Sequence, residues 1–331
     1  VGWIGLNRLR AIAEEGGAEI VGIVDALPAA AHAAISCIEQ HARNACVVGD
    51  FDELLTQDLD GIVIATPSGL HAAQATAALQ RGTAVFCQKP LARTASEAGR
   101  VISAARDSDK LLSVDFCYRT VTGVPQLVDL ARGGELGEIY AADLVFHNAY
   151  GPDKAWFYDR QQSGGGCVMD LGIHLLDLAL LVLDYPRVRS VTSQLHAAGK
   201  LLAKPVDELE DHAFAEVQFN TGATVRIACS WRLSAGQDAV IEAAFYGTRG
   251  AVILHNLEGS FYNFAVEHCV GTARHTVAMG DNRWGGRAAN AWVHELSQGA
   301  RFDARANRFY DLSVLIDAIY GRTAEEQPCE Y

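Results

Sequence analysis

The feature that most constrains the fold is a regular alternation of short apolar segments and helical segments in the first third of the chain. The apolar segments read as buried strands and lie at 19–25, 60–66, 83–87 and 111–115. The helical segments between them lie at 28–43, 68–81 and 94–107. Continuous apolar strands separated by helices are typical of a parallel sheet covered on both faces. The pattern therefore predicts a doubly wound α/β domain.

A short glycine motif opens the chain. Gly2 and Gly5, with Trp3 and Ile4 between them, form the second half of a G-x-G-x-x-G loop. Such glycines permit a tight turn and let a pyrophosphate approach a helix N-terminus. Asp25 stands twenty residues after Gly5, at the end of the next strand. An acid there bonds the ribose 2′-hydroxyl and repels a 2′-phosphate, so the segment predicts a Rossmann-type site for NAD rather than NADP. A chance strand-end aspartate is the alternative.

One strand of this fold is missing from the sequence. A doubly wound sheet needs a first, central strand before the Gly-rich loop, and the sequence opens inside the loop. Without that strand, backbone groups of its neighbours would be unpaired, at a large cost in free energy. We therefore expect that the chain is an N-terminally truncated form of a longer protein, which the upstream coding sequence would test.

The pattern changes after about residue 118. Helical segments are expected at 121–132, 171–183, 287–299 and 305–321. Strands are expected at 137–147, 188–197, 211–219, 223–232, 239–247, 250–255 and 260–267. Because the strands from 188 onward have no helices between them, the second sheet should be largely antiparallel. We predict a Rossmann domain over 1–118 and an open-faced α+β domain over 119–331, whose last helix could pack back on the first domain.

Composition narrows the possible partners and location. The formal charge of −13 disfavours nucleic acid and anionic membrane surfaces. No apolar run approaches the length of a membrane span. The eight cysteines are scattered without zinc-site spacing, as expected of free thiols in the reducing cytoplasm. We expect no bound metal.

Polar residues follow two of the predicted strands. Thr66, Pro67, Ser68 and His71 come after one strand, and the segment 88–90 comes after the next. Ligands of open α/β sheets bind at these carboxyl ends. Lys89, in the second segment, could stabilise a developing alkoxide, although a solvated surface lysine is the alternative reading.

A third segment adds acid–base groups. Gly164, Gly165 and Gly166 precede a helical segment that carries Asp170 and His174. Four residues apart, these two side chains would share one helix face. A histidine can accept the proton of a substrate hydroxyl or return it, and an aspartate can orient the imidazole or the substrate. A purely structural pair is the alternative, and no third ligand suggests a metal.

Together these segments resemble the Gfo/Idh/MocA oxidoreductases, a family named for glucose-fructose oxidoreductase and inositol dehydrogenase. The resemblance spans essentially the whole chain and depends on motifs in the family's order: Ala65–His71, Lys89-Pro90, Val114–Arg119 and Gly164–His174. It implies an NAD(P)-dependent enzyme acting on a CH–OH group of a sugar, cyclitol or related molecule. It also implies that Lys89, Asp170 and His174 are the catalytic trio. The residues expected at the cofactor are Gly2, Trp3, Ile4, Gly5, Asp25, Thr66, Pro67, Ser68, His71, Gln88 and Lys89.

One residue departs from the family's usual Glu-Lys-Pro. This chain has Gln88, which keeps a hydrogen-bonding side chain but removes a carboxylate near Lys89. The substitution leaves the detailed mechanism open. For the substrate we expect Tyr118, Arg119, Asn148, Trp156, Asp170 and His174. The segment 230–232 and His255 could also reach the pocket.

Two other functions stay open beside the dehydrogenase. One is a glycoside-processing enzyme that recycles tightly held NAD, and the other is a dinucleotide-binding sensor without catalysis. The open sheet face also predicts a homodimer or homotetramer formed through the C-terminal sheet, since large apolar faces are normally covered.

Overall fold

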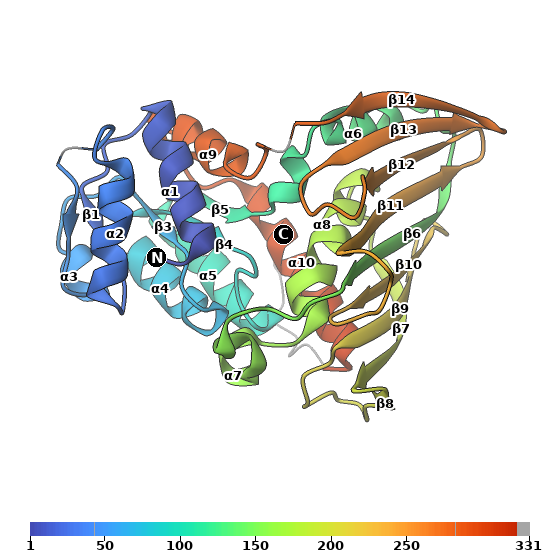
Figure 1. Cartoon of the computed structure of the whole chain (residues 1–331), viewed down its shortest axis with the longest axis horizontal. Helices are drawn as coiled ribbons and strands as arrows, with labels where there is room; N and C mark the ends of the chain where they lie inside the picture. Colours follow the sequence, from blue (N-terminus) through green and yellow to red (C-terminus); the bar gives the residue numbers. More distant parts are fainter. Residues whose placement is uncertain (43, 282, 323–331) are drawn as a thin grey trace. The chain divides into compact units, whose positions relative to one another are not determined.

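The computed structural model describes residues 1–42, 44–281 and 283–322 (Figure 1). The chain divides into two compact units, each assembled from several segments. Unit 1 contains Val1–Ala92, Glu97–Cys117 and Gly285–Tyr310. Unit 2 contains Arg93–Ser96, Tyr118–Trp284 and the chain from Asp311 onward.

Unit 1 has five parallel strands. They are β1 (Gly22–Ile23), β2 (Cys46–Val47), β3 (Gly61–Ile64), β4 (Ala84–Gln88) and β5 (Leu112–Asp115). The strands form two separate sheets, β1–β2 and β3–β4–β5, and every pair in both is parallel. The prediction of a parallel sheet is thus confirmed.

The helices of unit 1 alternate with these strands. They are α1 (Trp3–Glu15), α2 (Pro28–Ile38), α3 (Phe51–Leu54), α4 (Ser68–Gln80), α5 (Ala95–Ser108) and α9 (Arg287–Ser297). The predicted helices at 28–43, 68–81 and 94–107 are confirmed, although α2 ends five residues early. Helix α10 (Asn307–Tyr320) begins in unit 1 and continues in unit 2.

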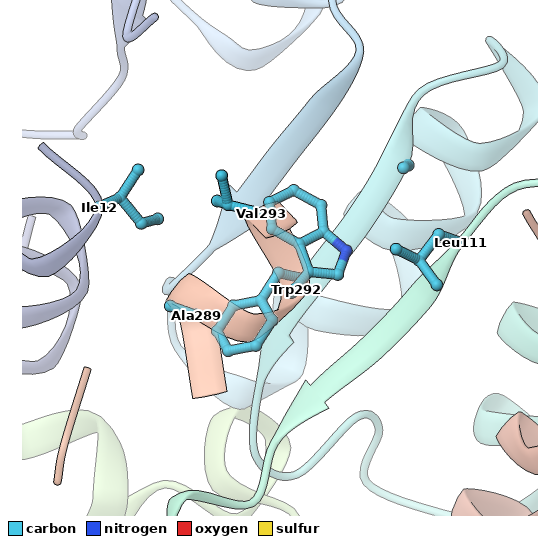
Figure 2. Packing of buried hydrophobic residues seen from close by; sticks show 7 residues of the cluster. Ile12, Leu111, Ala289, Trp292 and Val293 are labelled. Atoms are coloured by element: carbon cyan, nitrogen blue, oxygen red, sulfur yellow. The ribbon is translucent and has the colours of Figure 1, made fainter. Parts of the chain in front are cut away.

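Helix α9 belongs to the core of unit 1, although it is encoded far from the rest of that unit. Trp292 of α9 packs in a cluster with Ile12 of α1 and with Leu111 beside β5 (Figure 2). Its indole also explains a glycine at the start of β3, because a Cβ on Gly61 would lie 2.6 Å from the Trp292 ring. The segment that returns to the first unit, Gly285–Tyr310, therefore contains α9 and the first residues of α10.

Unit 2 is built on a nine-stranded sheet. Its order is β14-β13-β12-β11-β6-β10-β9-β7-β8. The strands are β6 (Ile139–Asn148), β7 (Val188–Ala197), β8 (Lys200–Leu201), β9 (His212–Phe219), β10 (Thr224–Ser230), β11 (Ala239–Gly247), β12 (Ala251–Asn256), β13 (Phe264–Val270) and β14 (Ala273–Met279). All pairs are antiparallel except β6 with β10, so the prediction of a mainly antiparallel sheet is confirmed. Strands β8 and β14 were not predicted.

The helices of unit 2 lie on one face of this sheet, as Figure 1 shows for α6 (Val124–Arg132) and α8 (Ile173–Val182). Helix α6 begins three residues later than predicted, because Gly123 adopts a φ of +92° and breaks the helical path. A Cβ on Gly123 would also lie 2.7 Å from the Cβ of Ala278.

One helical run among the described residues is long and apolar enough to span a membrane by length and composition. It covers Arg160–Val182. The expectation that no run approaches this length was therefore wrong. In the most apolar 18-residue stretch of this run, 89% is buried inside the structure. The run therefore resembles the central helix of a globular domain.

Candidate functional site

The N-terminus of α1 has the features of a pyrophosphate site. Gly2 is the residue before the helix and, being a glycine, has no side chain with which to cap the first backbone N–H groups. A Cβ on Gly2 would meet no atom within 4 Å, which leaves open space above the helix end. A Cβ on Gly5 would lie 3.1 Å from the Cβ of Ala65, so this glycine allows close packing of helix on strand. These are the roles of the second and third glycines in a dinucleotide-binding fingerprint. The residues present therefore fit the pyrophosphate of a dinucleotide cofactor.

Asp25 follows β1 and is partly exposed. Its Oδ1 accepts a hydrogen bond from the Leu27 backbone N–H at 2.8 Å. Its side chain is 20% exposed. The carboxylate is therefore oriented by the turn that follows it.

His71 links the two turns after β3 and β4. Its Nδ1 lies 2.7 Å from the carbonyl oxygen of Pro90, and its Nε2 lies 2.8 Å from that of Thr66. Burial lowers the pKa of His71, against the opposing effect of these two acceptors. Thr66 also donates through Oγ1 to Gln74 at 2.7 Å. His71 thus supports both turns; its direct contact with a cofactor stays a prediction.

Gln88 ends β4 and is tied to a buried ion pair. Its Nε2 donates to Oδ2 of Asp115, a residue with no exposed surface. The same Oδ2 accepts a hydrogen bond from Nε of Arg8 at 2.5 Å, and Arg8 is only 3% exposed. Residue 88 therefore faces a carboxylate. A neutral amide can donate to that carboxylate, whereas a glutamate would repel it.

Lys89 follows Gln88 in this charged cluster. Its ammonium lowers the pKa of His71 and of Cys117. For Cys117, burial and Asp115 outweigh that effect and raise the pKa to about 12. Lys89 thus stands within electrostatic reach of His71 and Cys117.

Asp170 and His174 lie at the start of α8, in unit 2. Asp170 is part of a single π-helical turn, η3 (Val168–Gly172), and His174 is the second residue of α8. The regular α-helix expected from the sequence is therefore distorted at this point, since the Ile173 N–H donates to the Val168 carbonyl five residues back. Such π-turns are frequent at functional sites.

Each of these two side chains has a fixed neighbour. Oδ2 of Asp170 accepts a hydrogen bond from the Trp231 indole at 3.1 Å. The His174 ring lies 4.8 Å from the Tyr118 ring. Tyr118 is 5% exposed and also packs against Phe146 and Trp284. Of the segment 230–232, Trp231 contacts Asp170; the place of this segment in a substrate pocket stays a prediction.

The other residues predicted to bind substrate have structural partners. Arg119 makes a bidentate ion pair with buried Asp177 of α8, at 2.7 and 2.5 Å. Oδ1 of Asn148 accepts the Tyr150 N–H at 2.7 Å and shapes the turn after β6. Trp156 stacks on Phe157 with ring centroids 3.8 Å apart. Their contacts with a substrate stay predictions.

Two buried acids in these regions were missed from the sequence. Asp115 holds Gln88, and Glu210 accepts hydrogen bonds from Gly166 and Val168 in the Gly-rich turn. The sequence around a buried acid has no spacing or periodicity that distinguishes it from an exposed one. Asp115 ends an apolar strand and belongs to the motif Val114–Arg119, but neither signal indicates its contact with Gln88. Among the described residues, no group of three or more His, Cys, Asp or Glu could hold a metal ion.

Comparison with known proteins assigns both halves of the chain. Residues 1–116 match the model described as "Oxidoreductase family, NAD-binding Rossmann fold", and residues 124–253 match the "GFO/IDH/MocA C-terminal domain". Together these matches define an NAD-binding oxidoreductase. The chain belongs to the Gfo/Idh/MocA family, as its motifs indicated.

Relatives with named activities cover different shares of the chain. D-glucoside 3-dehydrogenase of Escherichia coli is 29% identical over 61% of this chain, and the match spans 60% of that enzyme's length. Inositol 2-dehydrogenase of Rhizobium meliloti is 26% identical over 98% of this chain and 96% of its own length.

Solved structures confirm the fold. Levoglucosan dehydrogenase in complex with NADH and levoglucosan superposes with a TM-score of 0.80 at 21% identity, covering 96% of this chain and 94% of that one. The 3-ketoreductase KijD10 of Actinomadura kijaniata, in complex with NADP, gives 0.77 at 19% identity, covering 94% and 92%.

Proposed function

We propose that the protein is a dehydrogenase or reductase that acts on a hydroxyl-bearing carbon of a sugar, a cyclitol or a related small molecule, with NAD as its cofactor. The observation that carries the proposal is the pair of acid–base side chains at the start of α8. Asp170 is held by Trp231, and His174 is packed on Tyr118. The named activities of the inositol and glucoside relatives support the substrate class.

Three side chains divide the work in this proposal. His174 takes the proton of the substrate hydroxyl during oxidation and returns it during reduction. Lys89 stabilises negative charge on the reacting oxygen, and Asp170 orients the substrate and the histidine. When bound, the nicotinamide supplies the redox chemistry by accepting a hydride from the substrate carbon or returning one. The chain itself contributes positioning and charge stabilisation.

Asp25 supports the preference for NAD. A carboxylate at the end of β1 can accept a hydrogen bond from the ribose 2′-hydroxyl, and it repels the 2′-phosphate of NADP. Since KijD10 was solved with NADP, the preference needs a direct comparison. We expect tighter binding of NADH than of NADPH, and we expect Asp25→Ser to narrow the difference.

The activity is tested by a spectrophotometric screen. NAD⁺ and NADP⁺ reduction would be followed over polyols and aldoses, and NADH oxidation over ketoses. With an active substrate, His174→Ala and Lys89→Ala should each lose about 10²-fold or more in turnover while still binding NADH. Exposed His275→Ala and Lys200→Ala are matched controls that should keep normal turnover. Near-normal turnover of either site variant would refute its assignment.

The same screen separates the two alternative functions. A cofactor that stays bound through purification, with substrate consumed and no net NADH formed, would indicate recycled NAD in a glycoside-processing enzyme. Dinucleotide binding without turnover of any compound would indicate a sensor.

Assembly and location are further parts of the proposal. The face of the unit 2 sheet opposite α6 and α8 carries Phe214, which is 50% exposed, and we propose that a homodimer or homotetramer covers it. Light scattering should then show an oligomer that Phe214→Glu weakens. We also propose a reducing compartment, the cytoplasm, because the structure joins none of the seven cysteines among the described residues in a disulfide.

A further inference from the structure

Glu210 is a fully buried acid that the proposed chemistry does not use. It lies just before β9, is 0% exposed, and contacts the Gly-rich turn that precedes α8. Its Oε2 accepts the Gly166 N–H at 3.0 Å, and its Oε1 accepts the Val168 N–H at 2.9 Å. Its backbone carbonyl accepts the Cys167 N–H at 3.1 Å. One residue thus binds three consecutive N–H groups of the turn.

Tyr320, near the end of α10, completes this arrangement. Its hydroxyl donates to Oε1 of Glu210 at 2.7 Å, and its side chain is fully buried. Two residues later, the Arg322 guanidinium donates to the Gly164 carbonyl at 2.8 Å and lies over the Tyr320 ring at 4.1 Å. Segments far apart in the sequence therefore hold the same turn.

These contacts explain the run of glycines. A Cβ on Gly166 would lie 1.9 Å from the Glu210 carbonyl oxygen, and a Cβ on Gly165 would lie 2.1 Å from the Tyr320 hydroxyl. Gly164 has a φ of +83°, which side chains rarely adopt. Gly165 and Gly166 are thus needed for close contact with Tyr320 and Glu210, and Gly164 for the left-handed backbone of the turn.

The turn passes this constraint directly to the proposed catalytic residues. The Asp170 N–H donates to the Gly166 carbonyl at 3.0 Å. Gly166 therefore contacts both Glu210, through its N–H, and Asp170, through its carbonyl. We infer that Glu210, held by Tyr320, is a positioning residue that sets where Asp170 and His174 stand. This inference depends on the proposed function for its catalytic consequence. The hydrogen bonds themselves do not depend on it.

The chemistry of the contact indicates which variant is informative. All three groups that face the Glu210 side chain are donors, and a carboxylate can accept from each of them. The amide of Glu210→Gln has a single acceptor oxygen, so its NH₂ group would face at least one N–H or O–H donor. Tyr320→Phe removes one donor and keeps the ring. Val217→Ala is the control, because it opens a cavity at a fully buried position of β9 away from these hydrogen bonds.

The experiment combines hydrogen–deuterium exchange with kinetics on the full chain. In Glu210→Gln we expect faster exchange of the amides in 164–171 than in Val217→Ala, with unchanged binding of NADH. With an active substrate, we expect kcat to fall about 10- to 100-fold with little change in KM, because a small misplacement of reacting groups is enough for such a loss. Tyr320→Phe should change both quantities in the same direction by less.

Two results would overturn the inference. One is exchange in 164–171 that matches the Val217→Ala control, and the other is a kcat equal to that of the control. If Glu210→Gln does not fold, the same criteria apply to Tyr320→Phe. If the wild-type protein turns over no compound, the proposed function fails, while the exchange result still decides whether Glu210 holds the turn.

Discussion

Replacing Gln88 with glutamate, the residue usual in this family, should destabilise this particular chain. In the native structure the Gln88 amide donates to Asp115, and both side chains are buried. Arg8 already pairs with the same carboxylate oxygen. The Gln88→Glu substitution would therefore set a second carboxylate against the first, with one guanidinium between them.

The expected magnitude follows from the shared proton. Two carboxylates at hydrogen-bond distance hold one proton between them at neutral pH. Keeping a carboxyl with a free pKa of about 4.3 protonated at pH 7 costs about 4 kcal/mol, at about 1.4 kcal/mol per pH unit. The folded variant then binds a proton that the unfolded chain has released. Its free energy of unfolding should fall, relative to the wild type, as the pH rises from about 4.3 to 7.

A double-mutant cycle tests this reasoning. Thermal and urea unfolding of Gln88→Glu, Asp115→Asn and the double variant would be measured between pH 5 and 7.5. Asp115→Asn alone leaves Arg8 buried without its counter-ion, which costs about 3–5 kcal/mol. The double variant restores one carboxylate beside one guanidinium and should recover most of the loss. Two results would refute the reasoning. One is a loss of unfolding free energy in Gln88→Glu that does not change with pH. The other is a double variant that is no more stable than the less stable of the two single variants.

Three further perturbations have clear expectations. Trp292→Ala should lower the free energy of unfolding by about 3–5 kcal/mol in urea denaturation, because it leaves a cavity at a buried position of unit 1. A loss smaller than that caused by a substitution at an exposed position would contradict the packing in Figure 2. Burial lowers the pKa of His71, so the folded protein resists protonation of this side chain. The free energy of unfolding should therefore fall as the pH drops below about 6.5. The melting temperature of His71→Gln should depend less on pH over that range than the melting temperature of the wild type. Trp231→Phe removes the indole donor to Asp170 and should lower kcat about 10-fold or more with NADH binding intact; unchanged kcat would separate Asp170 from the reaction.

Local patterns were enough to predict most of the secondary structure. The runs that became β3, β4 and β5 are apolar over most of their length, so their burial between helices could be predicted from residue type alone. The motif residues after these strands were found for the same reason, since the carboxyl end of a parallel strand marks where ligands bind. The parallel pairing of β6 with β10 could not be predicted, because side-chain alternation does not encode strand direction.

The partners of the candidate residues were beyond the sequence. Arg119 follows a strand, and its ion pair with Asp177, 58 residues away, has no counterpart in the sequence pattern. Glu210 was missed because its donors are backbone N–H groups, which leave no mark on residue identity. Asp115 was read as part of a motif, and its link to Gln88 appeared only when β4 and β5 paired in register.

The return of α9 to unit 1 limits how this protein can be divided or recombined. A single cut near residue 118 would separate Trp292 from the apolar surface of Ile12, Phe86 and Leu111, and would expose that surface to water. A graft of the nucleotide-binding unit onto another scaffold would therefore need two pieces of chain, the N-terminal segment and 285–310. Random recombination with a relative should yield stable chimaeras mainly when both pieces come from the same parent, so the coding regions for 1–117 and 285–310 are expected to be inherited together.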